Sequence, residues 1–568
     1  MSILSIQDFG AEPNQASDAT LAVFAALERC RELERPTLLF PEGTYHFWPE
    51  HAVERQLFIP NHDQDKNRRI AFPLFGMNGL TIDGQGSEFI FHGLTLPFVL
   101  DQCEDVTVRN VRLDWERPIL SQGKVIRAGE GTFDVEIGVE YPFKIAGRQL
   151  VFIGEGWEEP CKGIIEMDLV TKTPAFQSGD YLNYGHYAKL QVEPLSTNVI
   201  RYSGAGSRLP KVGSVLIFQC GGRDCPGFYV NSSLNTKLEG VELHHAIGMG
   251  VIAQRSENIT LRGVGITLRP GTSRLFTTAA DATHFVYCRG RIEMEGCTFE
   301  NQMDDPCNVH GIYMTFQRQI SEDTLLLRLN HMQQRGAAVF QPGEHVRFID
   351  KQSLLPQLEA VVKGGRCLNP EFYLLTFDRK LPRTVDLNSA VENMSWAADV
   401  LIRQCTARAN RARGFLITTP GKVLIENNLI STPGSGIKIS GDANHWFESG
   451  AVRDIMIRGN TFEDCNYCYP EWGSAAIDID PEIQRADPGG ECYHANIVIE
   501  GNRFIAFHPY LLKGRSVNGI TFTNNVVVRS NRYPAIRNAE YDISLSTCKN
   551  ITVNDNQCPT DAKIIVNV

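Results

Sequence analysis

Three aspartates in this sequence have types and spacing that could do acid–base chemistry. Asp304 and Asp305 are adjacent in the segment N-Q-M-D-D-P-C-N-V-H-G (301–311), and Asp281 opens D-A-T-H-F-V-Y (281–287). Clustered carboxyl groups repel one another, which raises at least one pKa, so that one acid can donate a proton while another activates water. Cleavage of a glycosidic bond needs this pair of roles. A calcium site and ordinary turn residues are the alternatives that the spacing leaves open.

Alignment of the two segments pairs Asp281 with Asp305 and His284 with Asn308. If each segment belongs to one coil of a stack, the paired residues lie about 4.8 Å apart, one above the other. Asp304 is then displaced sideways on its own coil. We expect like-charge neighbours to raise the pKa of Asp304, which makes it the general acid, while Asp281 and Asp305 orient the water.

The elements that must position these acids follow from a repeated strand phrase. Alternating apolar residues ending in Gly or Asn recur throughout the chain, as in LTIDGQG (80–86), NITLRGVGI (258–266), RIEMEGCTF (291–299), VLIENNLI (423–430) and ITFTNNVVV (520–528). Period-two alternation predicts strands, and Gly or Asn supplies the positive φ of a tight corner. Repeats of this kind predict an all-β fold, a right-handed parallel β-helix.

The start of the chain and two interruptions complete the predicted organisation. The N-terminal segment resembles that of pectate-lyase-like β-helix proteins, in which an amphipathic helix, here from Ala19 to Cys30, caps the open end of the stack. Two stretches lack the phrase and carry other short alternating strands, which predicts two inserted small antiparallel β-barrels. The expected units are the first β-helix part with the capping helix (1–116), a barrel (117–225), the β-helix with the aspartates (226–311), a second barrel (312–398) and the last β-helix part (399–568).

Composition limits the classes of function. The formal net charge of −11 argues against nucleic acid and against anionic membrane surfaces as partners. No apolar run is long enough for a transmembrane helix, and the first residues do not look like a signal peptide, so we expect a cytoplasmic protein, or a periplasmic or secreted one if the chain is a mature form. The fifteen cysteines are expected to be mostly buried apolar residues, and neither a metal nor a cofactor is predicted.

Several long motifs narrow the interpretation. The acid cluster is similar in kind to that of polygalacturonases, but the chain resembles glycoside hydrolase family 110 more closely and along its whole length. The motifs that carry this resemblance are the DFGA opening, YHFWPEH (45–51), ADATH (280–284), QMDDPCNVHG (302–311), RARGFLITTPGKVLIENN (411–428) and SGDANHWFESG (440–450). The resemblance implies an exo-acting, metal-independent hydrolase that releases terminal α-1,3-linked galactose, as in Galα1-3Gal and the blood-group B determinant, with inversion. It also implies a homodimer.

The resemblance implies that Asp281, Asp304 and Asp305 are the catalytic acids. We expect the sugar to be bound by nearby donors and one aromatic ring, namely His284, Asn308, His310, Arg411, Arg413 and Trp446. Trp48 is either a core residue or a rim contact, and Glu448 is interpreted as an ordinary loop acid. Two other functions stay open, a hydrolase or lyase of acidic polysaccharides and a β-helix that binds carbohydrate without catalysis.

Overall fold

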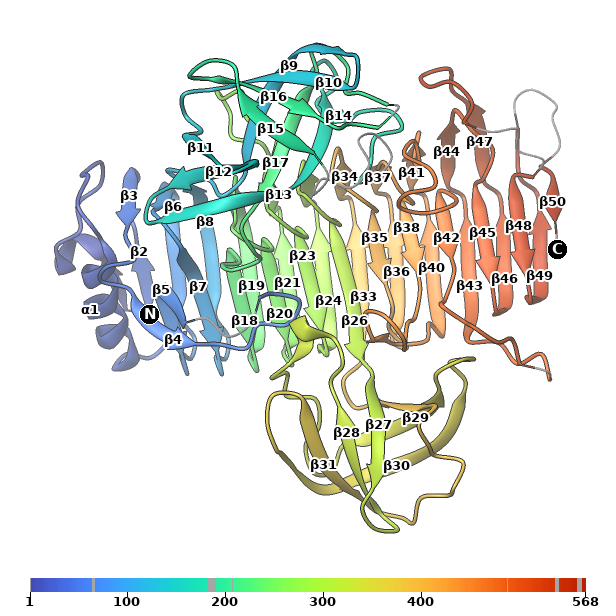
Figure 1. Ribbon diagram of the computed structural model, residues 1–568. Coiled ribbons are helices and arrows are strands. Elements are labelled where there is room, and N and C mark those ends of the chain that lie inside the picture. Colours follow the sequence, from blue (N-terminus) through green and yellow to red (C-terminus); the bar gives the residue numbers. More distant parts are fainter. Residues whose placement is uncertain are drawn as a thin grey trace.

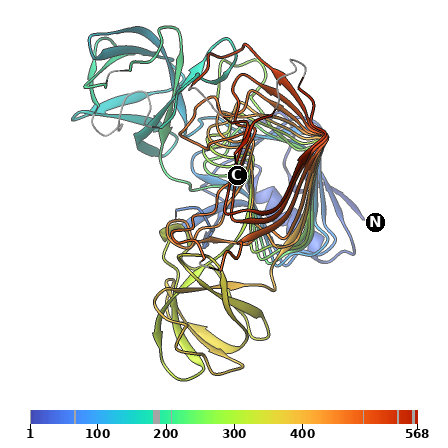
Figure 2. The ribbon, with the colours of Figure 1, turned by 90° about the vertical axis from the view of Figure 1, so that its right-hand side faces the viewer.

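The computed structural model describes residues 2–63, 67–180, 190–206, 208–487, 489–536, 541–558 and 564–567. The chain winds into a long stack of coils with two small β domains attached (Figure 1). Both domains lie on the same side of the stack when it is viewed along its axis (Figure 2). The predicted right-handed parallel β-helix with two inserted antiparallel barrels is confirmed.

Within the described residues, the coils build two long sheets. The 21-stranded sheet bends around one corner and contains β1 (Ile3–Ser5), β2 (Thr37–Leu39), β3 (Thr44–Phe47), β6 (Thr81–Phe91), β8 (Thr107–Trp115), β19 (Leu234–Leu243), β21 (Glu257–Arg262), β22 (Gly265–Ile266), β24 (Arg289–Glu295), β25 (Thr298–Glu300), β33 (Ala398–Arg403), β34 (Thr406–Arg408), β36 (Lys422–Glu426), β37 (Leu429–Ser431), β40 (Asp454–Arg458), β41 (Thr461–Glu463), β43 (His494–Glu500), β44 (Arg503–Ala506), β46 (Val517–Thr523), β47 (Val526–Arg529) and β49 (Lys549–Asn554). Alternate residues of these strands point inward and form one continuous apolar core.

The 14-stranded sheet forms the face between the attached domains. Its strands are β4 (Val53–Gln56), β5 (Asn67–Phe75), β7 (Thr95–Asp101), β18 (Phe228–Asn231), β20 (Val251–Gln254), β23 (Thr283–Val286), β26 (Cys307–Ile312), β35 (Phe415–Ile417), β38 (Ile437–Ile439), β39 (Glu448–Ser449), β42 (Ile477–Ile479), β45 (Leu512–Arg515), β48 (Ile543–Ser546) and β50 (Val566–Asn567). All pairs are parallel except β4 with β5 and β39 with β26. Parallel pairing stacks equivalent residues of successive coils in columns.

Buried asparagines hold one corner of the stack. Asn428, Asn460, Asn502 and Asn525 each follow the first strand of a coil, and each side-chain amide donates to a carbonyl of the previous coil and to the next asparagine side chain. Each backbone N–H donates to the next asparagine as well, so the corner amides are paired although they are buried. The Asn that the sequence pattern assigns to a turn therefore also joins neighbouring coils.

The first attached domain leaves the stack after β8 and returns before β18. It is a nine-stranded, nearly closed antiparallel sheet of β9 (Ser121–Gly129), β10 (Thr132–Ile137), β11 (Phe143–Ala146), β12 (Gln149–Gly154), β13 (Trp157–Asp168), β14 (Thr173–Pro174), β15 (Gln191–Pro194), β16 (Val199–Ser203) and β17 (Val215–Cys220). The second leaves directly from β26 and is a closed barrel of β27 (Met314–Gln319), β28 (Thr324–Arg328), β29 (His345–Asp350), β30 (Pro356–Cys367), β31 (Phe372–Phe377) and β32 (Ser389–Asn393). We call them barrel I and barrel II.

One α-helix covers the N-terminal end of the stack. Helix α1 spans Thr20–Arg31 and packs against β5 and β2, close to the span expected from the sequence. Among the described residues, no helix combines the length and apolar character needed to cross a bilayer. Ten cysteines are buried, as expected, and burial raises the pKa of Cys288 and of Cys468 to about 12.

Candidate active site

The register of the central strands stacks the predicted residues in a column. Thr283 of β23 pairs with Cys307 of β26, which pairs with Phe415 of β35. Asp281, Asp305 and Arg413 each stand two residues before these partners, and His284 pairs with Asn308 as the alignment predicted. The adjacent coils are joined directly, because the amide of Asp305 donates to Asp281 Oδ1 at 3.3 Å.

The three carboxyl groups meet in one pocket. Oxygen atoms of Asp281, Asp304 and Asp305 lie within 4.8 Å of one another. The pocket contains about 380 Å³ of empty space, open solvent included. Its lining is polar and comes from distant parts of the chain: Asn61, Arg223, Asp281, His284, Asp304, Asp305, Asn308, Arg413, Leu416, Trp446 and Glu448.

Three arginines surround the acids. Arg223 donates to Asp304 Oδ2 at 2.7 Å, and Arg411 Nη1 lies 3.2 Å from Asp304 Oδ1. Arg413 contacts both oxygens of Asp305, with its backbone amide 2.8 Å from Oδ1 and Nη2 2.9 Å from Oδ2. Asp281 is the member of the cluster that contacts none of these arginines.

The arginines give the acids different pKa values. Burial alone would raise the pKa of Asp304, but Arg411, Arg223 and Arg413 outweigh it and hold that pKa below its ordinary value. The expectation that Asp304 has a raised pKa is therefore wrong. Burial and the charge of Asp304 raise the pKa of Asp281 to about 8. Burial also raises the pKa of Asp305, to about 7, although Arg413 opposes it.

Two histidines continue from Asp281 into the protein. His284 Nδ1 lies 2.6 Å from Asp281 Oδ2, its Nε2 lies 2.8 Å from His310 Nε2, and His310 Nδ1 lies 2.6 Å from the carbonyl oxygen of Gly311. A carbonyl oxygen only accepts, so His310 Nδ1 carries a hydrogen. The contact between His284 and His310 and the contact between Asp281 and His284 each need one hydrogen as well. Three protons on one carboxyl and two imidazoles give a chain without net charge. Burial and His310 lower the pKa of His284 well below its usual range, so the shared proton rests on Asp281.

The remaining predicted residues are divided between the pocket and the layer behind it. Asn308 lines the pocket, and its Oδ1 accepts no hydrogen bond from the described residues, which leaves it available to a sugar hydroxyl. Trp446 lines the pocket from the loop before β39 and is 44% exposed. Arg411 lies behind Asp304, where it is also paired with Asp180, and His310 lies behind His284. These last two residues do not line the pocket.

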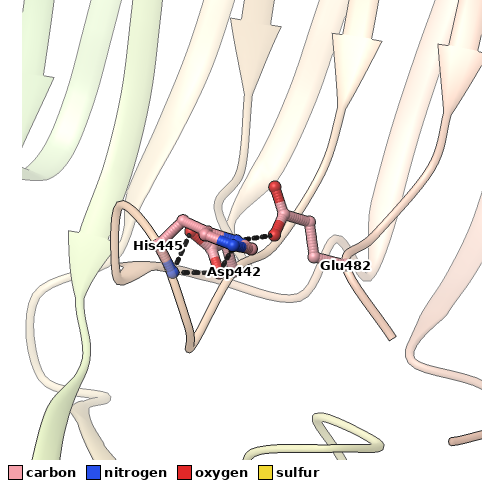
Figure 3. A group of neighbouring side chains, drawn as sticks. All are labelled: Asp442, His445 and Glu482. Atoms are coloured by element: carbon pink, nitrogen blue, oxygen red, sulfur yellow. Dashed lines mark hydrogen bonds and ion pairs between the residues drawn. The ribbon is translucent and has the colours of Figure 1, made fainter. Parts of the chain in front are cut away.

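An acidic cluster braces the loop that carries Trp446. Figure 3 shows Asp442, His445 and Glu482, which could each offer one ligand atom to a cation. However, Asp442 already accepts from the backbone amides of residues 444 to 447, and His445 Nδ1 lies 2.6 Å from Glu482. The carboxylate of Asp442 therefore fixes the turn that carries Trp446. On the other side, Gln334 of barrel II donates to the Trp446 carbonyl at 2.7 Å.

Sequence reasoning missed Arg223, Asn61 and Asp180, and it assigned Glu448 to an ordinary loop. Arg223 follows the last strand of barrel I, where the chain returns to the coils. Asn61 lies in the segment between β4 and β5, and its amide donates to the Gln333 carbonyl of barrel II. Neither residue belongs to the repeated phrase, so the one available signal was its position at the edge of an insertion. Glu448 lines the pocket, with Oε1 3.5 Å from His310 Nε2.

Comparison with known proteins gives matches along the whole chain. Family models described as GLAA-B beta-barrel domain I and GLAA-B beta-barrel domain II match residues 121–216 and 324–391. Alpha-1,3-galactosidase B of Bacteroides thetaiotaomicron is 34% identical over 98% of this chain and 91% of that protein. Alpha-1,3-galactosidase A of Shewanella woodyi is 35% identical over 97% of this chain and 90% of that protein. Alpha-1,3-galactosidase B of Akkermansia muciniphila is 34% identical over 98% of this chain and 69% of that protein.

Proposed function

Because this chain belongs to the α-1,3-galactosidase family, we propose that it is a glycoside hydrolase that releases terminal α-1,3-linked galactose from glycans, with the three-aspartate pocket as its active site. The observation that carries the proposal is the meeting of Asp281, Asp304 and Asp305 in one polar pocket beneath Trp446. The polar lining suits a single terminal sugar, whose hydroxyls can bind to Arg413, Asn308 and Glu448.

The roles of the acids follow from which of them holds a proton. Asp281 is protonated near neutral pH, so it is the proposed general acid for the leaving oxygen. Asp305, with a pKa of about 7, is suited to take the proton of the attacking water. Asp304 stays ionised between Arg223 and Arg411 and stabilises positive charge at the anomeric carbon. His284 and His310 keep the acid proton on Asp281 before the reaction, and the acid step requires that this proton turn from His284 Nδ1 to the leaving oxygen.

Comparison of leaving groups tests this assignment, because a good leaving group needs little protonation. Asp281→Asn should lose most activity on Galα1-3Gal and retain much more on an aryl α-galactoside with an acidic phenol. Asp304→Asn should be impaired on both substrates to a similar degree. If the phenol restores activity to Asp304→Asn and not to Asp281→Asn, then Asp304 is the general acid.

We further propose inversion at the anomeric carbon. The aspartate oxygens are closer than the separation of about 6.5–9.5 Å that is usual between the carboxyl groups of inverting enzymes. The proposal runs against this spacing and rests on the family resemblance and on the assigned roles, with Asp281 as the acid and Asp305 as the base that activates water. Proton NMR during the first turnovers should therefore show β-galactose before mutarotation. Initial α-galactose would mean retention, with one aspartate as the nucleophile.

A substrate panel tests the function as a whole. Galα1-3Gal, the fucosylated blood-group B trisaccharide and polygalacturonate should be incubated with the enzyme and the released sugar measured. Release of galactose from the first two and no cleavage of the third supports the proposal. Cleavage of polygalacturonate would favour the acidic-polysaccharide alternative.

The homodimer that the family resemblance implies should give twice the chain mass of 63.5 kDa in light scattering.

A further inference from the structure

A second groove lies at the N-terminal end of the sheet that carries the active site. It contains about 910 Å³ of empty space, open solvent included. Residues from the coils and from the β12–β13 turn of barrel I line it: Trp48, Pro49, Glu50, Asn67, Arg69, His92, Gly93, Leu94, Glu155 and Gly156. The mechanism proposed above uses none of them.

The aromatic ring in this groove is held rigidly. The half-buried indole of Trp48 stacks on the imidazole of His92, with ring centroids 3.9 Å apart and planes 7° apart. His92 is itself fixed, because its Nδ1 lies 2.8 Å from Glu155 Oε1 and its Nε2 lies 3.0 Å from His46 Nδ1. The second oxygen of Glu155 accepts from the amide of Gly93 at 3.1 Å. Such a ring is a preorganised platform for the apolar face of a sugar.

Polar groups surround the platform. Arg69 is exposed, and in the described residues its side chain pairs with no carboxylate. Glu50 and Asn67 line the same groove, and the side-chain amide of Asn67 donates to Glu54 Oε1 at 3.0 Å. An aromatic face beside polar groups of both charges matches a neutral pyranose, which presents hydroxyls around an apolar ring face, better than an anion or an apolar ligand.

The register places the groove in line with the active site. Arg69 of β5 pairs with Thr95 of β7, and the ladder continues through β18 and β20 to β23. When this register is followed from strand to strand, Arg69 lies in the same row as Ala280, the residue before Asp281. Four strand steps separate β5 from β23, or about 19 Å at 4.8 Å per step. One branched or extended glycan can span this distance.

We propose that the Trp48 groove is an accessory binding site for a neutral pyranose residue of the same glycan whose terminal galactose enters the aspartate pocket. The proposal rests on the proposed function for the identity of its ligand class. It assigns no catalytic role to Trp48 or Arg69, which act on substrate affinity alone.

Binding of a sugar that lacks the scissile galactose tests the groove separately from turnover. The probe is lacto-N-neotetraose, a neutral β-linked tetrasaccharide, titrated by calorimetry and by saturation-transfer NMR. Trp48→Ala should weaken binding by about tenfold, which is the upper end of what one aromatic contact contributes. Arg69→Ala should weaken it severalfold without disturbing the Trp48–His92 stack. Trp48→Phe should stay close to the parent, and Trp446→Ala, which alters only the catalytic pocket, should still bind.

Kinetics provide the second readout. Trp48→Ala should hydrolyse an aryl α-galactoside like the parent but show a raised KM for an α-galactosylated pentasaccharide. Absence of binding by the parent, unchanged affinity in both Trp48→Ala and Arg69→Ala, or loss of binding in Trp446→Ala alone would overturn the proposal. Failure of the parent to cleave any α-galactoside would instead refute the proposed function, and the titration would still report on the groove.

Discussion

Replacement of Asp281 and of Asp304 by asparagine should change stability in opposite directions. At 281 the new amide can donate to His284 Nδ1 while its oxygen accepts from the Asp305 amide, so the hydrogen bonds of a protonated Asp281 are kept. At 304 the same change removes the charge that Arg223 and Arg411 contact at 2.7 and 3.2 Å. The two variants are thus a matched pair that differ in the protonation state of the residue replaced.

The size of each effect follows from the pKa of the acid in the folded and unfolded chain. An unfolded aspartate has a pKa of about 3.9, whereas folded Asp281 has a pKa of about 8. Folded Asp281 keeps its proton where the unfolded chain has lost it, so its contribution is fully present below pH 4 and is lost as the pH rises to 8. Four pKa units set an upper limit of about 5 kcal/mol on this loss. Asp281→Asn has no ionisable group at this position, so it does not suffer this loss of stability and should be more stable than the parent at pH 8.

The contribution of Asp304 to stability changes with pH in the opposite direction. Its folded pKa is lowered, so its contribution to stability is present above pH 4 and is lost as the pH falls through the folded value. Removal of one partner of a largely buried ion pair costs about 3 kcal/mol. Asp304→Asn should therefore be less stable than the parent at pH 8, with the difference shrinking at low pH.

Thermal unfolding followed by circular dichroism at pH 4.5, 6 and 8 measures both variants beside the parent. The melting temperature of Asp281→Asn should rise above that of the parent as the pH increases, and that of Asp304→Asn should fall below it. Asp134→Asn, which removes an arginine-paired acid within barrel I, is the control for a general loss of charge. If Asp281→Asn is less stable than the parent at pH 8, Asp281 is ionised in the folded protein and the proton count along the histidine chain is wrong.

Three further outcomes are expected. Arg223→Met should raise the pKa of Asp304 and lower kcat/KM for an aryl galactoside, whereas Arg201→Met in the same barrel should not; equal loss in both would point to damage to barrel I. His310→Phe should reduce kcat about tenfold at unchanged KM and move the basic limb of the pH profile of kcat to lower pH. The reason is that His284, without His310, no longer keeps the proton on Asp281. A reduced kcat with the basic limb at its original pH would contradict this. Asn460→Ala should destabilise the protein by about 2–3 kcal/mol in denaturant unfolding and leave kcat unchanged. The substitution leaves the Ile425 carbonyl and the Asn428 backbone amide without their hydrogen-bond partner, at a corner far from the pocket. An unchanged stability would show that water replaces the lost hydrogen bonds.

The β-helix and its column of site residues could be predicted because their signals are local and periodic. Each coil repeats the same alternation, and the 24-residue offset between Asp281 and Asp305 is one turn of the stack. The charge environment could not be predicted, because Arg223 arrives at the end of an inserted barrel whose docking follows no repeat. Without that arginine, like-charge repulsion appeared to dominate at Asp304, whereas the arginines hold its pKa below the ordinary value.

For the same reason, two predicted sugar ligands, His310 and Arg411, lie behind the residues that line the pocket. The strand pattern identifies which residues of β26 point outward, and it does so for both Asn308 and His310. It gives no information on the loop that covers part of that face. The loop of Trp446 and Glu448 pairs with the end of β26 through β39, so His310 is covered while Asn308 stays open to the pocket.

The way barrel II leaves the stack has a consequence for synthesis of the chain on the ribosome. Strand β24 finds its next neighbour only in β33, where Ile292 pairs with Val400, 108 residues later. At about 5–20 residues per second, the growing end of the solenoid waits roughly 5–20 s with an open strand edge directly behind the catalytic coil. Barrel II is closed and contains three hairpins, so it can fold during that interval, and the pairing of β27 with β32 brings its two ends together. The insertion thus serves as a clamp that returns the nascent chain to the coil where winding stopped.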